Sequence, residues 1–236
     1  MTDLPRPNAV PTPRPAPRLL ATPPRGRVLC FAPHPDDEVI GPGGTLARHA
    51  RQGDVVRVVV ATDGGSGDPD ACFPREGYGE RRRAESRAGL LELGVRESSF
   101  WGYPDACVLT EADLLGIADR AAAELAAWRA DVVYLPWSGE HNSDHRALHD
   151  GVMRALRRTG FRGQAFGYEV WSPLEPDLVV DIEDVVDAKR RALACYATQL
   201  RYVDYAHVIL GLNAYRSLHC GGGQGHAEAF CDLRHS

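Results

Sequence analysis

Short apolar runs alternate with longer amphipathic segments along most of this chain. The run DVVRVVVAT (54–62) is almost wholly β-branched, which is typical of a parallel strand buried on both faces of a sheet. Strands that alternate with helices predict right-handed βαβ units, so we expect an α/β fold with a doubly wound, mostly parallel sheet in a single domain. The expected strands are 27–32, 54–62, 98–105, 131–136, 165–171 and 177–182, and the expected helices are 43–53, 79–95, 111–129, 145–158 and 184–197.

The first 25 residues differ from the rest of the chain. They hold eight of its 17 prolines and no periodic apolar pattern. Proline has no backbone N–H to donate to the hydrogen bonds of a helix or of a pair of β-strands. Residues 1–25 are therefore predicted to form an extended or disordered arm. The arm could instead wrap the surface of the domain or the second subunit of a homo-oligomer. Residues 26–236 have the length and composition of one globular domain.

Charge and cysteine content argue against several classes of protein. The formal net charge is -5 and no basic patch stands out, so neither nucleic acid nor an anionic membrane is an expected partner. No apolar run reaches the roughly 18 residues of a membrane helix, and no signal pattern opens the chain. The six cysteines form no CxxC pair, which favours free thiols in a reducing cytoplasm. Cytoplasmic localisation is therefore expected.

A histidine and three consecutive acids directly follow the first expected strand. These residues are His34, Asp36, Asp37 and Glu38, in the stretch CFAPHPDDEVIGPGG. Adjacent carboxylates repel one another near a protein interior unless a cation or several donors compensate them. His34 and Asp37 lie three positions apart and can converge on one divalent ion, while Asp36 could take a proton from water beside it. Alternatively, the acids could only start a helix, where they favour the helix dipole; Glu38 is left unassigned.

A second polar cluster follows the strand at 131–136. The stretch GEHNSDHRALHDG offers His141, Asp144, His145 and His149. His145 could complete a site of two histidines and one carboxylate, the open arrangement of a catalytic zinc, and Asp144 could orient a ring nitrogen. Because ligands bind beyond the carboxyl ends of parallel strands, both clusters are expected at one crevice.

The glycine-rich stretches do not match known phosphate-binding loops. GPGG (41–44) and TDGGSGD (62–68) fit neither G-x-G-x-x-G nor a Walker pattern, and tight turns explain them better. A serine nucleophile is not indicated, since no G-x-S-x-G elbow occurs. His219 and His226, in the glycine-rich tail, are left unassigned.

Taken in order, these motifs resemble those of the zinc-dependent N-acetylglucosaminyl deacetylase superfamily, the PIG-L or LmbE-like deacetylases. The resemblance covers about residues 27–230. Its most specific motif is PHPDDE (33–38), followed by GGTLA (43–47), and the weaker ones are TDG (62–64), RRAESRAGLLELGV (82–95), GYPDA (102–106), DHRA (144–147), KRRALACYATQ (189–199) and AEAF (227–230).

The resemblance implies a Rossmann-like domain that removes an acyl group from the nitrogen of an amino sugar or its glycoside. The substrate would be a small N-acylated amino sugar, and the cofactor Zn²⁺, although iron or cobalt suits the same ligands. Carried over by position, the implied residues are the zinc ligands His34, Asp37 and His145, the general base Asp36, and the sugar-binding Arg82 and Asp105.

One position departs from the pattern of the family. The second motif of the family usually reads His-x-Asp-His, and its first histidine stabilises the oxyanion of the tetrahedral intermediate or protonates the amine. Asn142 occupies the position of that histidine in this chain. Either His141 takes the role through a bulge, or Asn142 donates a neutral hydrogen bond to the oxyanion. An impaired or repurposed enzyme is the third possibility.

Two rival functions remain beside the deacetylase. One is an amidase of the same metal chemistry that acts on a larger sugar-thiol or antibiotic conjugate. The other is a non-catalytic sugar- or nucleotide-binding relative, which Asn142 would fit.

Overall fold

One mixed sheet forms the centre of the molecule. The computed structural model describes residues 15–106 and 110–233. Within these residues eight strands lie in the order β1-β7-β8-β6-β5-β2-β3-β4. The strands are β1 (Arg18–Leu20), β2 (Arg27–Ala32), β3 (Val55–Thr62), β4 (Glu97–Tyr103), β5 (Val132–Pro136), β6 (Gln164–Tyr168), β7 (Leu178–Asp181) and β8 (Ala227–Asp232). The expected α/β fold with a mostly parallel sheet is confirmed, since only β8 runs antiparallel to its neighbours, β6 and β7.

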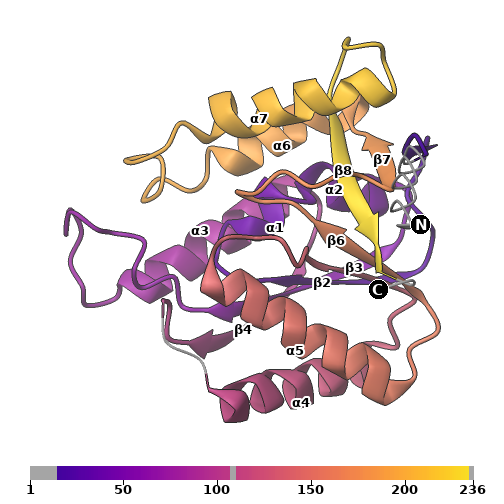
Figure 1. Cartoon of the computed structure of the whole chain (residues 1–236). Coiled ribbons are helices and arrows are strands. Elements are labelled where there is room, and N and C mark those ends of the chain that lie inside the picture. The colour runs from indigo at the N-terminus through magenta and orange to yellow at the C-terminus, as the bar shows by residue number, and fades with distance from the viewer. Residues whose placement is uncertain (1–14, 107–109, 234–236) are drawn as a thin grey trace, which may run out of the picture.

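Helices cover both faces of this sheet. Figure 1 shows α4 and α5 on one face and the other helices on the opposite face. Along β3, Val58 and Val60 belong to one core and Val59 to the other, as a strand buried on both faces requires. The helices are α1 (Asp37–Ile40), α2 (Gly43–Arg51), α3 (Tyr78–Glu92), α4 (Glu111–Trp128), α5 (Ser143–Thr159), α6 (Val186–Leu193) and α7 (Tyr205–Arg216), with short 3₁₀ turns at Glu183–Val185 and Ser217–His219.

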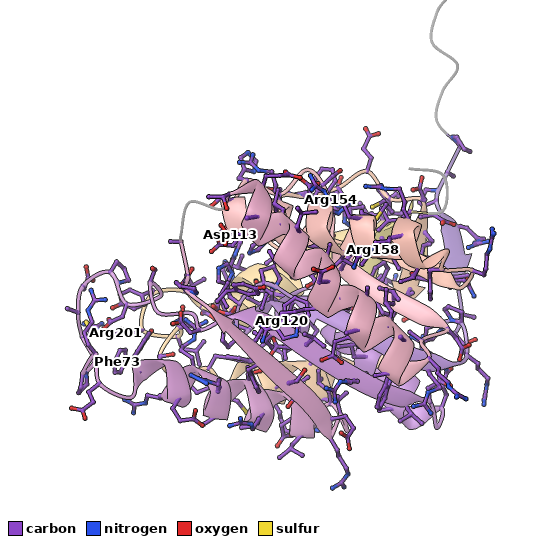
Figure 2. The ribbon with its side chains drawn as sticks, turned by 90° about the horizontal axis from the view of Figure 1, so that it is seen from below. Phe73, Asp113, Arg120, Arg154, Arg158 and Arg201 are labelled. Carbon is purple, nitrogen blue, oxygen red and sulfur yellow. The ribbon has the colours of Figure 1, made fainter. Side chains whose placement is uncertain are left out.

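Two ion pairs link α4 and α5 at the exposed surface of their helical layer. Figure 2 shows this face from below, with Arg154 and Arg158 of α5 beside α4. Arg154 pairs with Glu111, and Arg158 pairs with Asp119 at 2.7 Å. None of the described helices is long and apolar enough to span a membrane.

Part of the proline-rich arm belongs to the sheet. Arg18–Leu20 pairs in parallel with β7, and the Arg18 N–H donates to the Asp177 carbonyl at 2.9 Å. The expectation that proline density prevents ladder pairing is wrong here, because these three residues are not prolines and lie at a sheet edge, where only one side needs donors. Residues 1–14 of the predicted arm lie outside the described residues. The boundary at residue 26 stays a prediction.

Close packing, besides the expected turn, explains why glycine occurs in GPGG. Residues 41–42 do form a turn, but a Cβ added at Gly41 would lie 2.3 Å from the Tyr168 ring, and one added at Gly44 would lie 2.7 Å from Ile182. These two positions therefore let the backbone of α1 and α2 approach the neighbouring strand and loop.

The order of the strands places a crevice beside β2. From β2 the chain proceeds outward through β3 and β4, then crosses to β5 on the other side of β2 and continues to β6. Loops that leave β2 and β5 therefore diverge at the carboxyl edge of the sheet, as at the switch point of a doubly wound fold. Both predicted polar clusters lie on these two loops and in the helices α1 and α5 that directly follow them.

Candidate active site

The three predicted metal ligands lie together at this switch point. His34 follows β2 and Asp37 begins α1, while His145 lies in the first turn of α5. The His34 Nδ1 lies 3.0 Å from the Asp37 Oδ2, and the His145 Nε2 lies 3.2 Å from each of these two atoms. Ligand atoms from segments 111 residues apart in the chain thus converge on one point.

The chemistry of this cluster fits a divalent cation. The Asp37 Oδ1 is buried without a hydrogen-bond partner, and all three ligand atoms lie within 4.8 Å of one another. Burial alone would lower the pKa of His145, but the neighbouring Asp37 carboxylate raises it to about 9. Burial opposes ionisation of Asp37, yet the two histidines hold its pKa well below the usual range. The raised pKa of His145 and the lowered pKa of Asp37 describe a protonated imidazole beside a carboxylate. A divalent cation that replaced the imidazole proton would compensate the carboxylate and bind both histidines, with open positions for water and substrate.

Further carboxylates lie beside the second ring nitrogen of each of the two histidines. The His34 Nε2 lies 3.1 Å from the Asp105 Oδ1 and 3.2 Å from the Asp144 Oδ2. The buried Glu140 places its Oε2 3.4 Å from the His145 Nδ1. Such outer carboxylates set the tautomer and orientation of ligating rings. Asp144 therefore lies where a ring-orienting partner was expected, and Asp105, expected to bind a sugar hydroxyl, contacts His34 as well.

Asp36 lies beside the cluster in a separate polar environment. Its Oδ2 accepts hydrogen bonds from the Arg82 Nη2 at 3.1 Å and from the Tyr205 hydroxyl at 2.7 Å. Burial raises the pKa of Asp36 to about 6, although Arg82 opposes this rise. Arg82 also donates to the Pro35 carbonyl at 2.9 Å and is only 2% exposed. Arg82, expected to bind a sugar hydroxyl, is thus occupied with Asp36 and the loop backbone.

Glu38, unassigned from the sequence, supports the loop from behind. Its Oε2 accepts the Asp36 backbone N–H at 3.0 Å, and its Oε1 accepts the Tyr196 hydroxyl at 2.8 Å. Burial raises the pKa of Glu38 to about 7, against the hydrogen bond from Ser86. Glu38 therefore positions the backbone of Asp36.

His141 and Asn142 point to different neighbours. Asn142 lines the pocket and caps α5, since its Oδ1 accepts the Asp144 N–H at 2.8 Å. The expected start of this helix at residue 145 is therefore two residues late. The His141 ring contacts the Ser172 hydroxyl, and His141 is not among the described residues that line the pocket.

The other histidines of the sequence analysis lie elsewhere. The His149 Nδ1 contacts the Pro136 carbonyl at 2.8 Å, and the His226 Nδ1 pairs with Glu183 at 2.7 Å. Neither of these residues, nor His219, is among the described residues that line the pocket.

One pocket of about 290 Å³ lies beside the cluster, lined by His34 and Asp37 but not by the fully buried His145. The pocket adds residues that the sequence analysis did not single out, from the loop after β3, from the loop after β6 and from the chain between α6 and α7. Its lining residues are His34, Asp36, Asp37, Ser66, Gly67, Arg82, Asp105, Ala106, Asn142, Trp171, Gln199, Val203 and Tyr205. Tyr205 gave no signal of its own, because its partner Asp36 lies 169 residues away. Glu140 lies five residues before His145, in the stretch GEHNSDHRALHDG, but was not singled out.

Comparisons with known proteins find a matching family model, sequence relatives and a similar solved structure. The family model described as GlcNAc-PI de-N-acetylase matches residues 29–156. A 1D-myo-inositol 2-acetamido-2-deoxy-alpha-D-glucopyranoside deacetylase of Mycobacterium sp. (strain KMS) is 29% identical, with 74% of each chain covered. A 2'-N-acetylparomamine deacetylase of Streptomyces fradiae is 31% identical, also with 74% of each covered. The N,N'-diacetylchitobiose deacetylase of Pyrococcus horikoshii shares the fold, with a TM-score of 0.75, 22% identity, and coverage of 88% of this chain and 83% of that one.

Proposed function

Because the chain belongs to the GlcNAc-PI de-N-acetylase family, whose model matches more than half of it, we propose that it is a hydrolase that removes an N-acetyl group from an amino sugar or its glycoside. The observation that carries this proposal is the convergence of His34, Asp37 and His145, the first two of which line a pocket together with a second, differently held carboxylate, Asp36. The two relatives described above, both named as deacetylases of amino-sugar compounds, support the same substrate class.

The proposed cofactor is Zn²⁺, held by His34, Asp37 and His145. Two imidazoles and one carboxylate are the donor set of many catalytic zinc sites, although iron or cobalt suits the same ligands. A divalent cation held there supplies a Lewis acid for the amide carbonyl and acidifies the attacking water.

Asp36 is the proposed general base. Both of the hydrogen bonds described for its side chain end on Oδ2, so Oδ1 is the oxygen assigned to take the proton from the attacking water. A pKa of about 6 suits this role, because the group is mostly ionised at neutral pH yet can hold a proton. The same carboxyl group then returns the proton to the nitrogen as the C–N bond breaks, which releases acetate and a free amine.

Asn142 is the proposed oxyanion donor. Its Oδ1 caps α5, which leaves the Nδ2 group as the donor for the amide oxygen that becomes negative during attack. The position of Asn142 in the pocket lining, with His141 turned toward Ser172, supports this choice between the two.

The decisive experiment is a screen for primary-amine release from N-acetylated amino sugars and their glycosides. We expect release of amine and acetate in equal amounts, loss of activity with a chelator, and recovery with zinc. Asp36→Asn should keep its stoichiometric metal and lose about 10²- to 10⁴-fold in kcat. Near-normal turnover by Asp36→Asn would contradict the role of Asp36.

The same screen separates the rival functions. Release of an acid larger than acetate would identify an amidase of larger conjugates. Elemental analysis tests the other rival: absence of stoichiometric metal in protein purified without chelator would favour a non-catalytic binding protein.

A further inference from the structure

A second pocket lies at the other end of α5 from the active site, and we call it the α5-end pocket. Its volume is about 350 Å³, which is within the range of small-molecule sites. Its described lining comes from the last turns of α5, from the turn that leads into β6, from β6 itself and from Leu233. His145 lies in the first turn of α5 and Leu156 follows eleven residues later, so the rise of the helix separates the two sites by about 16 Å. Among the described residues, the two pockets share no lining residue.

The floor of the α5-end pocket is apolar and rigid. Met153, Leu156, Ala165 and Leu233 line it, and each is between 5% and 7% exposed. These four residues belong to the hydrophobic core that packs α5 against the sheet, and the Phe161 ring packs against that core. An apolar group that rested on this floor would therefore release water from a surface that is already ordered.

Two arginines form the rim of the α5-end pocket. Arg157 and Arg162 are both exposed, and within residues 15–106 and 110–233 neither side chain forms an ion pair or a hydrogen bond. The other two arginines in this half of α5 differ, because Arg154 and Arg158 pair with acids of α4 (Figure 2). No acidic side chain is among the described lining of the pocket. The rim therefore carries two positive charges that the protein itself leaves without a partner.

The end of α5 does not need these guanidinium groups for capping. Arginines in the last turn of a helix often donate to its free carbonyl groups. Here the Gly160 N–H donates to the carbonyls of Leu156 and Arg157, and the Phe161 N–H donates to the Leu156 carbonyl at 3.0 Å. Gly160 has a φ of 64°, the left-handed conformation with which glycine closes a helix. Both guanidinium groups are therefore available to a ligand.

The polar groups of the lining limit the kind of ligand. Arg157 and Arg162 are the only polar side chains among the described residues that line the α5-end pocket. A sugar or a nucleotide would lose water from many hydroxyl or phosphate oxygens and find few partners. A molecule with a single anionic group on an apolar body would match both the rim and the floor.

We propose that the α5-end pocket binds an anionic amphiphile, a molecule with one carboxylate on an apolar body of the size of a medium-chain fatty acid. The carboxylate is held at the rim by Arg157 and Arg162, and the apolar body covers the floor. This site is separate from the active site, and the proposal does not depend on the proposed deacetylation.

The test is calorimetric titration of the zinc-loaded protein with octanoate and three related compounds. Octanoate should bind at one molecule per chain. Octanamide has the same shape without the charge, and octylammonium has the opposite charge, so each should bind at least about tenfold more weakly. Acetate has the head group without the apolar body and should bind at least about a hundredfold more weakly.

Variants locate the bound octanoate, because a metal in the active site also accepts carboxylates. Arg157→Gln and Arg162→Gln should each weaken binding about tenfold, whereas Arg157→Lys keeps the charge and should lose less. The matched control is Arg158→Gln, next to Arg157 on the exposed surface of α5 but paired with Asp119, and it should bind octanoate like the wild type. Equal affinity in the wild type and in both glutamine variants would place octanoate elsewhere and overturn the proposal.

Two further results would also overturn the proposal. One is the absence of octanoate binding to the wild type, and the other is octanamide binding as tight as that of octanoate. In an active enzyme, saturating octanoate should leave KM for the amino-sugar substrate within twofold, and competitive inhibition would contradict a separate site. If the wild type releases no amine from any substrate, the proposed function fails, and the calorimetric comparison still decides whether the α5-end pocket binds an anionic amphiphile.

Discussion

Asn142 combines a structural and a chemical task in one side chain. Its Oδ1 caps α5 and its Nδ2 is the proposed oxyanion donor. Asn142→Ala should lower kcat about 10²-fold and destabilise the fold by about 1 kcal/mol. Asn142→Ser keeps a capping oxygen, so it should lose the same activity with almost no loss of stability. Initial rates and urea unfolding of the two variants measure these effects separately.

His141→Ala is the matched control at the neighbouring position. Because the His141 ring contacts Ser172, we expect kcat to stay within about threefold of wild type, as for a residue outside the reacting centre. A large loss in His141→Ala together with a small one in Asn142→Ser would assign the oxyanion to the histidine instead.

The site residues differ in how far the sequence could predict them. His34 and Asp37 are three positions apart, so local spacing predicts their convergence, and the strand-end rule brings His145 to the same edge. The environment of Asp36 could not be predicted in this way. Its partners Arg82 and Tyr205 lie 46 and 169 residues away, and only the packing of α3 and α7 brings them together.

At the scale of elements, two adjacent glycines of α2 should respond differently to the same change. A Cβ at Gly44 would lie 2.7 Å from Ile182, whereas one at Gly43 would lie 3.4 Å or more from its neighbours. Gly44→Ala should therefore destabilise the protein by about 1–3 kcal/mol through overpacking. Gly43→Ala should be neutral or slightly stabilising, since alanine favours the helix. Thermal melts of both variants measure the contrast, and equal destabilisation would show that helix propensity is not the only term at Gly43.

Two elements that the sequence analysis missed, β8 and α7, were missed for different reasons. The central strands β2, β3 and β5 were predicted well because burial on both faces leaves continuous apolar runs. The strand β8 has a short, mixed sequence, AEAFCD, after a glycine-rich stretch, and it inserts antiparallel between β6 and β7. Such pairing is decided by tertiary contacts that no local pattern reveals. Helix α7 begins at Tyr205 and follows the N-cap residue Asp204, a local signal that went unrecognised.

At the scale of the whole molecule, a buried ion pair joins the C-terminal strand to the segment that carries the site. Lys189 of α6, the only lysine of the chain, pairs with Glu228 of β8 at 2.6 Å. The Lys189 Nζ also donates to the carbonyls of Ile40 at 2.9 Å and Gly41 at 3.2 Å. Glu228 accepts the backbone N–H groups of α2, at Gly44 and Thr45, each at 2.7 Å.

Replacing Lys189 with a neutral side chain should therefore leave the buried Glu228 carboxylate without its cationic partner. Burial lowers the pKa of Lys189 although Glu228 opposes this, so the pair depends on close contact in a poorly solvated place. Lys189→Met should destabilise the fold by about 3–5 kcal/mol. The double variant Lys189→Met/Glu228→Gln should recover part of that loss, because no charge is then left unpaired. Urea unfolding of the wild type, both single variants and the double variant gives the coupling energy directly. A loss below about 1 kcal/mol in Lys189→Met would mean that the helix N–H groups alone compensate the Glu228 carboxylate.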